Sequence, residues 1–447
     1  MIKISLISKS TENLTNLVSH AARICYNPTL PKMGSTIDIE NLLFKTGHHT
    51  TLQHNFFTFL IDGLSINSTI FGLHLLHPFY NTDQRSGRFS KMYTNPDYDE
   101  IRNYILGYFP NSPIDKLISF IKKGRLIYKD NMKRAEKLVA ERIKEERPFA
   151  SDEYIEANAN KIAQEQMRVF ISTVFPTALD YTINLSTLNA IYRSAWTVEM
   201  KDITEQMKRL VLKECPNLEY MYKNQRQDNW SPKMINNIPK ILKTPSLEVL
   251  KIDNYDTFNS YISESDSVDL KYFTPERMNN NIFTILTEIE VSLATMAHDQ
   301  RHRTLKRTMP ELTGNFYLPP IPSMLGLEKI AEEYMLEYID LYNSLDKNLV
   351  LMLAPYGVMA KYKKIGDINA ITHEQEKRLC WSSQEEVYNL SRKLYEKISN
   401  NDKSEIREIS KFFLPSCYKK KCIEGKRYCG RDIKKCKISE PLIERTI

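Results

Sequence analysis

The stretch RHRTLKRTMPE at residues 301–311 decides how this chain is organised. It contains a histidine between two arginines, and Glu311 follows that triplet after seven residues. The same frame occurs once earlier, where Leu76-His77-Pro78 is followed after seven residues by Ser86. The earlier copy has the hydroxyl but no arginines, and the later copy has both arginines but a carboxylate instead of the hydroxyl. Because each half holds what the other lacks, we predict that a complete site is assembled from both halves.

The order of features along the chain supports an internal repeat. With 447 residues the chain is too long for one ordinary core, so two or three domains are expected. Strand-like and helical patterns run through residues 1–223 and start again in residues 275–415. Between them, residues 224–274 are rich in Asn, Asp, Ser and Pro, which predicts a linker or an irregular insertion. Residues 416–447 form a basic tail that contains cysteines.

Composition limits the possible classes of protein. Hydrophobic residues make up 42% of the chain and charged residues 26%, as in soluble globular proteins. No apolar run is long enough to span a membrane, and the N-terminus lacks the apolar core of a signal peptide. We therefore expect a cytoplasmic protein without membrane contact. The net charge of +7 suits an anionic small molecule as well as nucleic acid.

The tail contains four of the seven cysteines, Cys417, Cys422, Cys429 and Cys436. A cytosolic protein seldom forms disulfides. The spacing of these residues lacks the C-x2-C pair that is common in zinc sites. Reduced thiols are the preferred interpretation, with zinc binding as the alternative, and we assign no metal ligands.

Three groups of polar residues are candidates for ligand binding. The triplet Arg301–Arg303 is a dense cationic cluster, and the planar fork of arginine suits phosphates and carboxylates. Gln84, Ser86 and Arg88 alternate, so in an extended segment their side chains lie on one side. The third group is GHHTTLQH at residues 47–54. Taken singly, each group also fits a solvated surface. The absence of a GxGxxG segment after a strand, of a P-loop and of H-E-x-x-H disfavours the corresponding nucleotide-binding and zinc-protease classes.

Taken together, these segments resemble the flavin-dependent thymidylate synthases, the ThyX family. The signature of that family is R-H-R-x7-S, preceded by a G-H-E-[ST]-P-x-E-H segment and an F-T-F strand. Here GHHTTLQH (47–54) and FTF (57–59) resemble the preceding segments, and DQRSGRFSKM (83–92) resembles the family's E-x-S-x-R-Y. RLCWSSQEEV (378–387) resembles its R-x5-Q-W-E-I. The motifs are specific when they occur together.

The resemblance, which covers about residues 2–212 and 279–413, implies an α+β fold. It implies two tandem ThyX-like units, each with a small, mostly antiparallel sheet and long helices. Members of the family are homotetramers whose sites are shared between subunits. A chain that carries two units is then expected to form a homodimer that acts as a pseudo-tetramer. One kind of site would combine RHR from second halves with the S-x-R segment from first halves.

The resemblance also implies an activity. The family reaction methylates dUMP to dTMP, with methylenetetrahydrofolate as carbon donor, NADPH as reductant and FAD as cofactor. The resemblance implies that Arg378 is the catalytic residue and holds the uracil in a polarised form. It assigns dUMP binding to Gln84, Ser86, Arg88, Arg301 and Arg378. It assigns FAD binding to His48, Thr50, Gln53, His302 and Arg303.

The sequence departs from the family at several positions. Gln53 and Gln84 replace family glutamates. Ser172 and Leu351 occupy the position of a family arginine in the two halves, and Arg168, one turn before Ser172, is a candidate to replace it. These changes leave alternatives open: a related flavoenzyme that modifies another pyrimidine nucleotide, for example by hydroxymethylation, or a non-catalytic flavin or nucleotide binder. A basic nucleic-acid-binding protein is the least favoured alternative.

Overall fold

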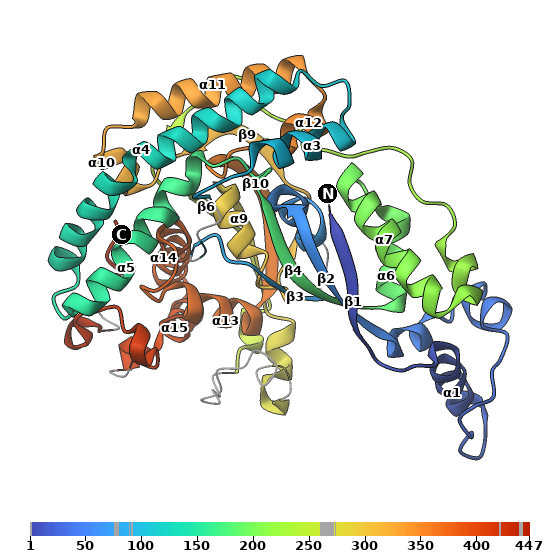
Figure 1. The fold of residues 1–447 in the computed structure, drawn as a ribbon. Coiled ribbons are helices and arrows are strands. Elements are labelled where there is room, and N and C mark those ends of the chain that lie inside the picture. The colour runs from blue at the N-terminus through green and yellow to red at the C-terminus, as the bar shows by residue number, and fades with distance from the viewer. Residues whose placement is uncertain are drawn as a thin grey trace.

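The computed structural model has an α+β architecture in which two units of similar topology pack against each other (Figure 1). This confirms the predicted fold class, with small, mostly antiparallel sheets and long helices. The structure describes residues 2–75, 80–88, 90, 93–259, 272, 274–419, 422–437 and 441–447.

The first sheet is antiparallel throughout. Its strand order is β1 (Lys3–Lys9), β2 (Phe56–Ser65), β4 (Pro176–Asn184) and β3 (Tyr80–Gln84). Along β2, Phe57, Phe59 and Ile61 are fully buried, while the residues between them point to the other face. This alternation is typical of a strand with one face on the core.

The second sheet repeats that order. Its main strands are β6 (Ser246–Asp253), β7 (Thr284–Ser292), β10 (Val358–Asp367) and β9 (Glu311–Tyr317), all antiparallel. β5 (Ile241–Leu242) adds in parallel to β9, and β8 (Lys306–Arg307) pairs with β10. The described part of residues 224–274 thus supplies two strands as well as a connection. Leu247 and Val249 alternate along β6 and pack against the core.

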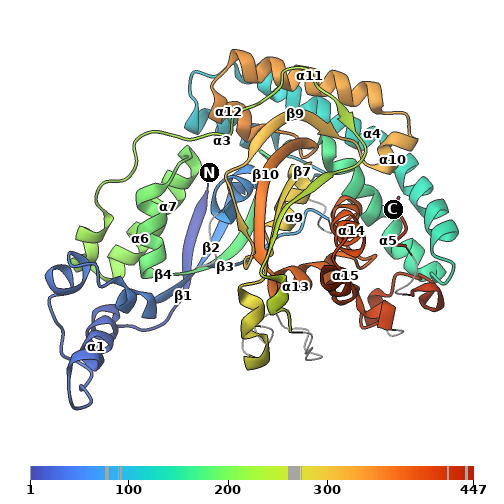
Figure 2. The same cartoon turned by 180° about the vertical axis from the view of Figure 1, so that it is seen from behind.

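Helices connect the third and fourth strands of both units. They include the long α4 (Ile114–Glu146) and α5 (Asp152–Met167) in the first unit, and the long α11 (Glu328–Ser344) and the short α12 (Lys347–Met352) in the second. Figures 1 and 2 show α4 and α11 side by side. Their contact includes the stacked rings of Phe120 and Tyr334, whose centroids are 4.6 Å apart. These helices join the two units into one body.

The helix after the second strand of each sheet begins at a serine cap. Ser65 Oγ accepts from Ser68 N (2.9 Å), and Ser292 Oγ accepts from Thr295 N (3.1 Å), which satisfies one free N–H of each helix. The two helices are α2 (Ile66–Ile70) and α9 (Leu293–Asp299). The other α-helices of the described residues are α1 (Leu14–Tyr26), α3 (Tyr98–Tyr108), α6 (Leu185–Ser194), α7 (Val198–Glu214), α10 (Pro320–Met324), α13 (Ile368–Arg378), α14 (Glu385–Ser399) and α15 (Ser404–Ile409).

Backbone hydrogen bonds join the units directly. Thr173 N donates to Ala354 O (2.8 Å), and Tyr356 N donates to Ile171 O (2.9 Å). Buried side chains from both units form one continuous hydrophobic core. We therefore expect the two units to depend on each other for stability.

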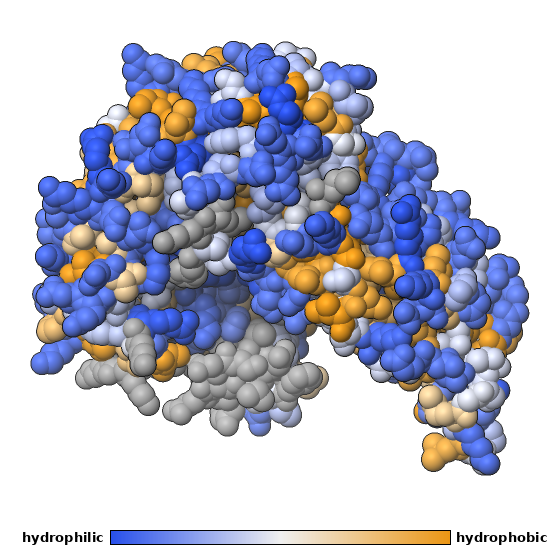
Figure 3. Space-filling view, viewed as in Figure 1, coloured by the Kyte–Doolittle hydropathy of each residue, from blue (hydrophilic) through white to orange (hydrophobic). Residues whose placement is uncertain are grey.

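The outer face of the first sheet remains exposed. Ile7, Phe56 and Leu60 are 54%, 47% and 39% exposed, and Figure 3 shows apolar side chains gathered over this part of the molecule. An exposed apolar sheet face is typical of an interaction surface. Among the described helices, none combines the length and apolar character needed to cross a membrane.

Candidate functional site

A cavity of about 360 Å³ lies between the two units. Its volume is at the lower end of the range for small-molecule sites. The described residues that line it are Ile66, Thr69, Gln84, Arg85, Ser86, Gly87, Arg88, Arg168, Ala297, His298, Arg301, Tyr356 and Arg378. All five residues that the sequence assigned to the nucleotide are among them. The split motif of the sequence is therefore joined in space within one chain.

The first unit supplies the end of β3 and the loop that follows it. Gln84 is the last residue of β3, and its amide lies 3.4 Å from Thr69 Oγ1. Ser86 Oγ accepts from the backbone N of Arg88 (3.3 Å), which shapes the turn. The Arg88 guanidinium forms an ion pair with Glu165 of α5 and donates to Ser382 O (3.1 Å). Arg88 is thus held in place by both units.

The second unit supplies the loop after α9. Arg301 Nη2 donates to Thr82 O (2.8 Å), and Arg303 Nη2 donates to the same oxygen (3.0 Å). The guanidinium of Arg303 also lies 5.6 Å from the centre of the Tyr80 ring. These contacts bind the RHR loop to β3 of the first unit, next to the segment that carries Ser86.

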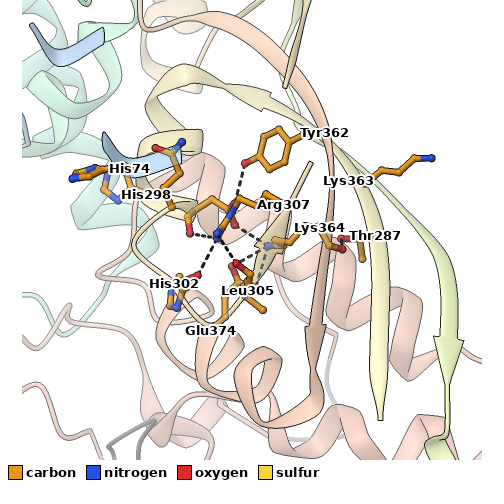
Figure 4. A network of polar contacts seen from close by, with 12 residues as sticks. His74, Thr287, His298, His302, Leu305, Arg307, Tyr362, Lys363, Lys364 and Glu374 are labelled. Atoms are coloured by element: carbon orange, nitrogen blue, oxygen red, sulfur yellow. Dashed lines mark hydrogen bonds and ion pairs between the residues drawn. The ribbon is translucent and has the colours of Figure 1, made fainter. Parts of the chain in front are cut away.

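A buried network of charged side chains holds the base of this loop (Figure 4). Asp299 accepts from Lys364 Nζ (2.8 Å), Tyr362 OH (2.9 Å) and Arg307 Nε (2.5 Å). Lys364 Nζ also donates to Glu374 (2.9 Å). Burial alone would raise the pKa of Asp299, but Arg307 and Lys364 outweigh it and hold that pKa well below its usual value. The network ties α9, β8, β10 and α13 together behind the cavity.

Arg378 ends α13 and is surrounded by groups of the second unit. Its Nε donates to His302 Nε2 (2.8 Å) and its Nη2 donates to His298 O (3.0 Å). Burial lowers the pKa of the Arg378 guanidinium, although Glu374 and Asp299 oppose the shift. The hydrogen bonds fix the plane of the guanidinium, so its position in the cavity is determined before any ligand binds.

Arg168 and His298 are among the lining residues of the cavity that were not assigned on sequence. Arg168 is only 4% exposed, and its Nη2 lies 3.1 Å from Gln384 Oε1 and 3.2 Å from His298 Nε2. Its Nε is buried and has no hydrogen-bond partner among the described residues. Its planar guanidinium also lies over the Tyr356 ring, 5.0 Å from the centre. Arg168 was a candidate to replace the missing family arginine, whereas His298 had no motif to mark it.

The cavity is strongly cationic. Arginines supply five of its described lining residues, and none of those residues is acidic. Arg88 is compensated by Glu165, and Arg301 has Asp83 at 3.5 Å. By contrast, no ion pair to a carboxylate is formed by Arg168 or Arg378 within the described part of the chain. Uncompensated buried cations favour an anionic ligand.

The residues assigned to FAD do not meet in one chain. His48, Thr50 and Gln53 lie at the start of the 3-10 helix η2 (His49–His54) or on it, are exposed, and do not line the cavity. Arg303 packs on Tyr80, and His302 is engaged by Arg378. A single copy of the chain therefore does not form a complete flavin site from these residues.

The fold and the cavity define a chain of two related α+β units that share an arginine-lined ligand pocket. Residues 5–217 match the family model described as "Thymidylate synthase complementing protein". The chain is 26% identical over 235 residues to the flavin-dependent thymidylate synthase of Clostridium tetani, with 48% of this chain and 85% of that protein covered. The first half of the chain thus belongs to the flavin-dependent thymidylate synthase (ThyX) family.

Two solved structures are also similar. The Helicobacter pylori ThyX structure with FAD and dUMP is 16% identical, covers 50% of this chain and 98% of its own, and has a TM-score of 0.32. A UMP/dUMP methylase, PolB from Streptomyces cacaoi, bound with 5-Br dUMP, is 20% identical, covers 50% of this chain and 94% of its own, and has a TM-score of 0.31. In the described part of the chain, no cluster of three or more His, Cys, Asp or Glu side chains has the arrangement of a metal site.

Proposed function

We propose that this protein is an FAD-dependent thymidylate synthase that methylates dUMP to dTMP, with methylenetetrahydrofolate as carbon donor and NADPH as reductant. The observation that carries the proposal is the cavity between the units, in which the buried Arg168 and the partly buried Arg378 form no ion pair to a carboxylate within the described residues. A nucleoside monophosphate brings a dianionic phosphate and a base whose carbonyls accept hydrogen bonds. Both needs are met by oriented guanidinium groups.

In this proposal each residue of the cavity contacts a different part of the nucleotide. Ser86 and Arg88 bind the phosphate, with Gln84 beside them. Arg301 contacts the nucleotide from the second unit. Arg378 donates to the pyrimidine and stabilises the negative charge that develops on the ring during reaction, because its guanidinium is already oriented in a buried site. Any redox step belongs to the cofactor.

A second copy of the chain completes the flavin site in this proposal. The residues assigned to FAD on or next to η2 do not line the cavity, and Arg303 is held against Tyr80 elsewhere in the same copy. The cavity of about 360 Å³ is also small for a flavin and a nucleotide together. The exposed apolar face of the first sheet, which includes Phe56 and Leu60, is a suitable contact surface for a homodimer. The dimer would then act as a pseudo-tetramer of four units.

The two halves are proposed to form one competent site for each chain. The frame in the first half has Leu76 and Pro78 at the positions of the two arginines, and both residues lie outside the described residues. The frame in the second half has Glu311, an exposed residue on β9, at the position of the hydroxyl. Neither copy of the frame can therefore supply both the arginines and the hydroxyl of the family signature.

An anaerobic assay of dTMP formation tests the proposal directly. Purified protein is supplied with FAD, NADPH, methylenetetrahydrofolate and dUMP, and the nucleotide product is identified by mass. We expect dTMP in the complete mixture and one tightly bound dUMP analogue for each chain. Ser86→Ala should weaken dUMP binding, whereas Glu311→Ala serves as the control and should leave it unchanged. A hydroxymethylated product, or no product with an intact flavin and bound dUMP, would contradict the assignment.

A further inference from the structure

Two histidines contact Arg168 and Arg378, two arginines of the cavity that form no ion pair to a carboxylate within the described part of the chain. Arg168 Nη2 lies 3.2 Å from His298 Nε2, and Arg378 Nε donates to His302 Nε2 at 2.8 Å. A guanidinium has five N–H donors and no acceptor. Each imidazole must therefore accept with the lone pair of its Nε2 atom. It follows that both rings are neutral and carry their proton on Nδ1.

An imidazole in this position acts differently from a carboxylate. A carboxylate orients an arginine through charge-assisted hydrogen bonds, but it also cancels the positive charge. A neutral imidazole supplies the hydrogen bond and leaves the charge in place. Because Arg168 is only 4% exposed, its uncancelled charge acts in a poorly solvated site, where electrostatic interactions are stronger than in water.

We propose that His298 and His302 are positioning residues, which orient Arg168 and Arg378 without neutralising them and so keep the cavity cationic for a dianionic nucleotide. The identity of that ligand rests on the proposed function. The two histidine–arginine contacts do not depend on it. The residues thereby divide into arginines that meet the ligand and histidines that act through the arginines.

The surroundings of both rings favour the neutral form. Burial lowers the pKa of His298 and of His302 well below the usual value, and the neighbouring cations lower both further. The charged groups that face His298 are Arg168, Arg88, Arg378 and Arg301. The titratable groups that face His302 are Arg378, Asp299, Lys364 and His373. Protonation would replace each acceptor by a donor that points at an arginine N–H, and the contact would be lost.

Calorimetric titration of the full chain with dUMP tests the proposal through paired substitutions. His298→Gln keeps a neutral acceptor and is expected to bind dUMP about as tightly as the wild type. His298→Glu places a carboxylate beside Arg168 and is expected to weaken binding by about ten- to a hundredfold, as for the loss of one charged hydrogen bond. Gln227→Glu adds a carboxylate at an exposed position and should change nothing. Equal affinities of the wild type and His298→Glu would overturn the proposal.

A second measurement uses the wild type alone, so it does not depend on whether the substituted proteins fold. ¹⁵N NMR of the histidine-labelled wild type should show both rings neutral at pH 6 with the proton on Nδ1. A protonated ring at either position contradicts the proposal. Failure of the wild type to bind dUMP would contradict the proposed function alone. The same variants titrated with inorganic phosphate would then decide this inference, with the same order of affinities expected.

Discussion

The buried network behind the RHR loop allows a stability prediction that can be worked out from its contacts. We consider Asp299→Asn, which removes the negative charge but almost preserves the shape of the side chain. Asp299 accepts from Lys364, Tyr362 and Arg307, and its side chain is 3% exposed. In the variant Arg307 loses its acidic partner, whereas Lys364 keeps Glu374.

The expected cost follows from these partners. Breaking a buried ion pair by removing one member costs about 3–5 kcal/mol, because the remaining charge stays desolvated. Since Lys364 retains a carboxylate, we expect a value near the lower limit, about 3 kcal/mol. For a cooperative unit of 447 residues that corresponds to a fall in melting temperature of roughly 3 °C. Because Asp299 precedes the RHR loop, nucleotide affinity should also fall.

Thermal unfolding followed by circular dichroism measures the first effect, and dUMP titration measures the second. The matched control is Asp340→Asn on α11, which makes the same chemical change at an exposed position. Surface changes of this kind usually stay within about 0.5 kcal/mol. If Asp299→Asn melts at the same temperature as Asp340→Asn, the network does not stabilise the loop and the reasoning is refuted.

Three further outcomes are expected. Arg378→Lys should lower turnover by about 10²-fold or more, since lysine cannot reproduce the guanidinium plane that is proposed to stabilise charge on the pyrimidine, and unchanged turnover in the dTMP assay would exclude that role. Arg168→Gln should weaken dUMP binding by about ten- to a hundredfold in calorimetric titration, and equal affinity would show that Arg168 does not reach the ligand. The third outcome concerns pH. Because His298 and His302 have folded-state pKa values below the unfolded value, the stability they contribute is present above about pH 6.5 and is lost as the pH falls. Below that pH, each histidine should lower the free energy of unfolding by up to about 1.4 kcal/mol per pH unit. Urea unfolding at pH 7.5 and 5.5 should show a smaller loss of stability for His298→Gln than for the wild type. All other groups titrate in both proteins, so identical losses would disprove the assignment.

Much of the lining of the cavity could be predicted from sequence because its residues lie in short motifs. Ser86 and Arg88 are separated by two positions on one loop, and Arg301 belongs to a compact triplet. Such short spacings can be recognised in a single sequence without a structure. The complementary defects of the two frames then indicated that the motifs meet, and the structure places them in one cavity.

The remaining features depend on packing that no local pattern records. His298 meets Arg168 only because α9 of the second unit lies against the 3-10 helix η4 (Arg168–Phe170) of the first unit. The available signal for His298 was its spacing: it lies three residues before Arg301, and residues three apart on a helix face the same way. β6 was hidden in a segment rich in polar residues, and its short alternation of Leu247 and Val249 was too weak to separate a strand from a linker. The roles of the three residues assigned to FAD on or next to η2 remain predictions.

The repeated strand order explains why a split site is physically tolerable. In a homo-oligomer of single units, one substitution appears in every site at once. In a fused pair, the two copies of a motif change independently, so the first unit can lose its arginines while the second keeps RHR. What both units must retain is the surface that brings them together. The backbone bonds at Thr173 and Tyr356 and the shared core meet that requirement, and they hold the surviving motifs of the two units at one cavity. The packing of the units therefore makes possible a site that neither sequence half encodes alone.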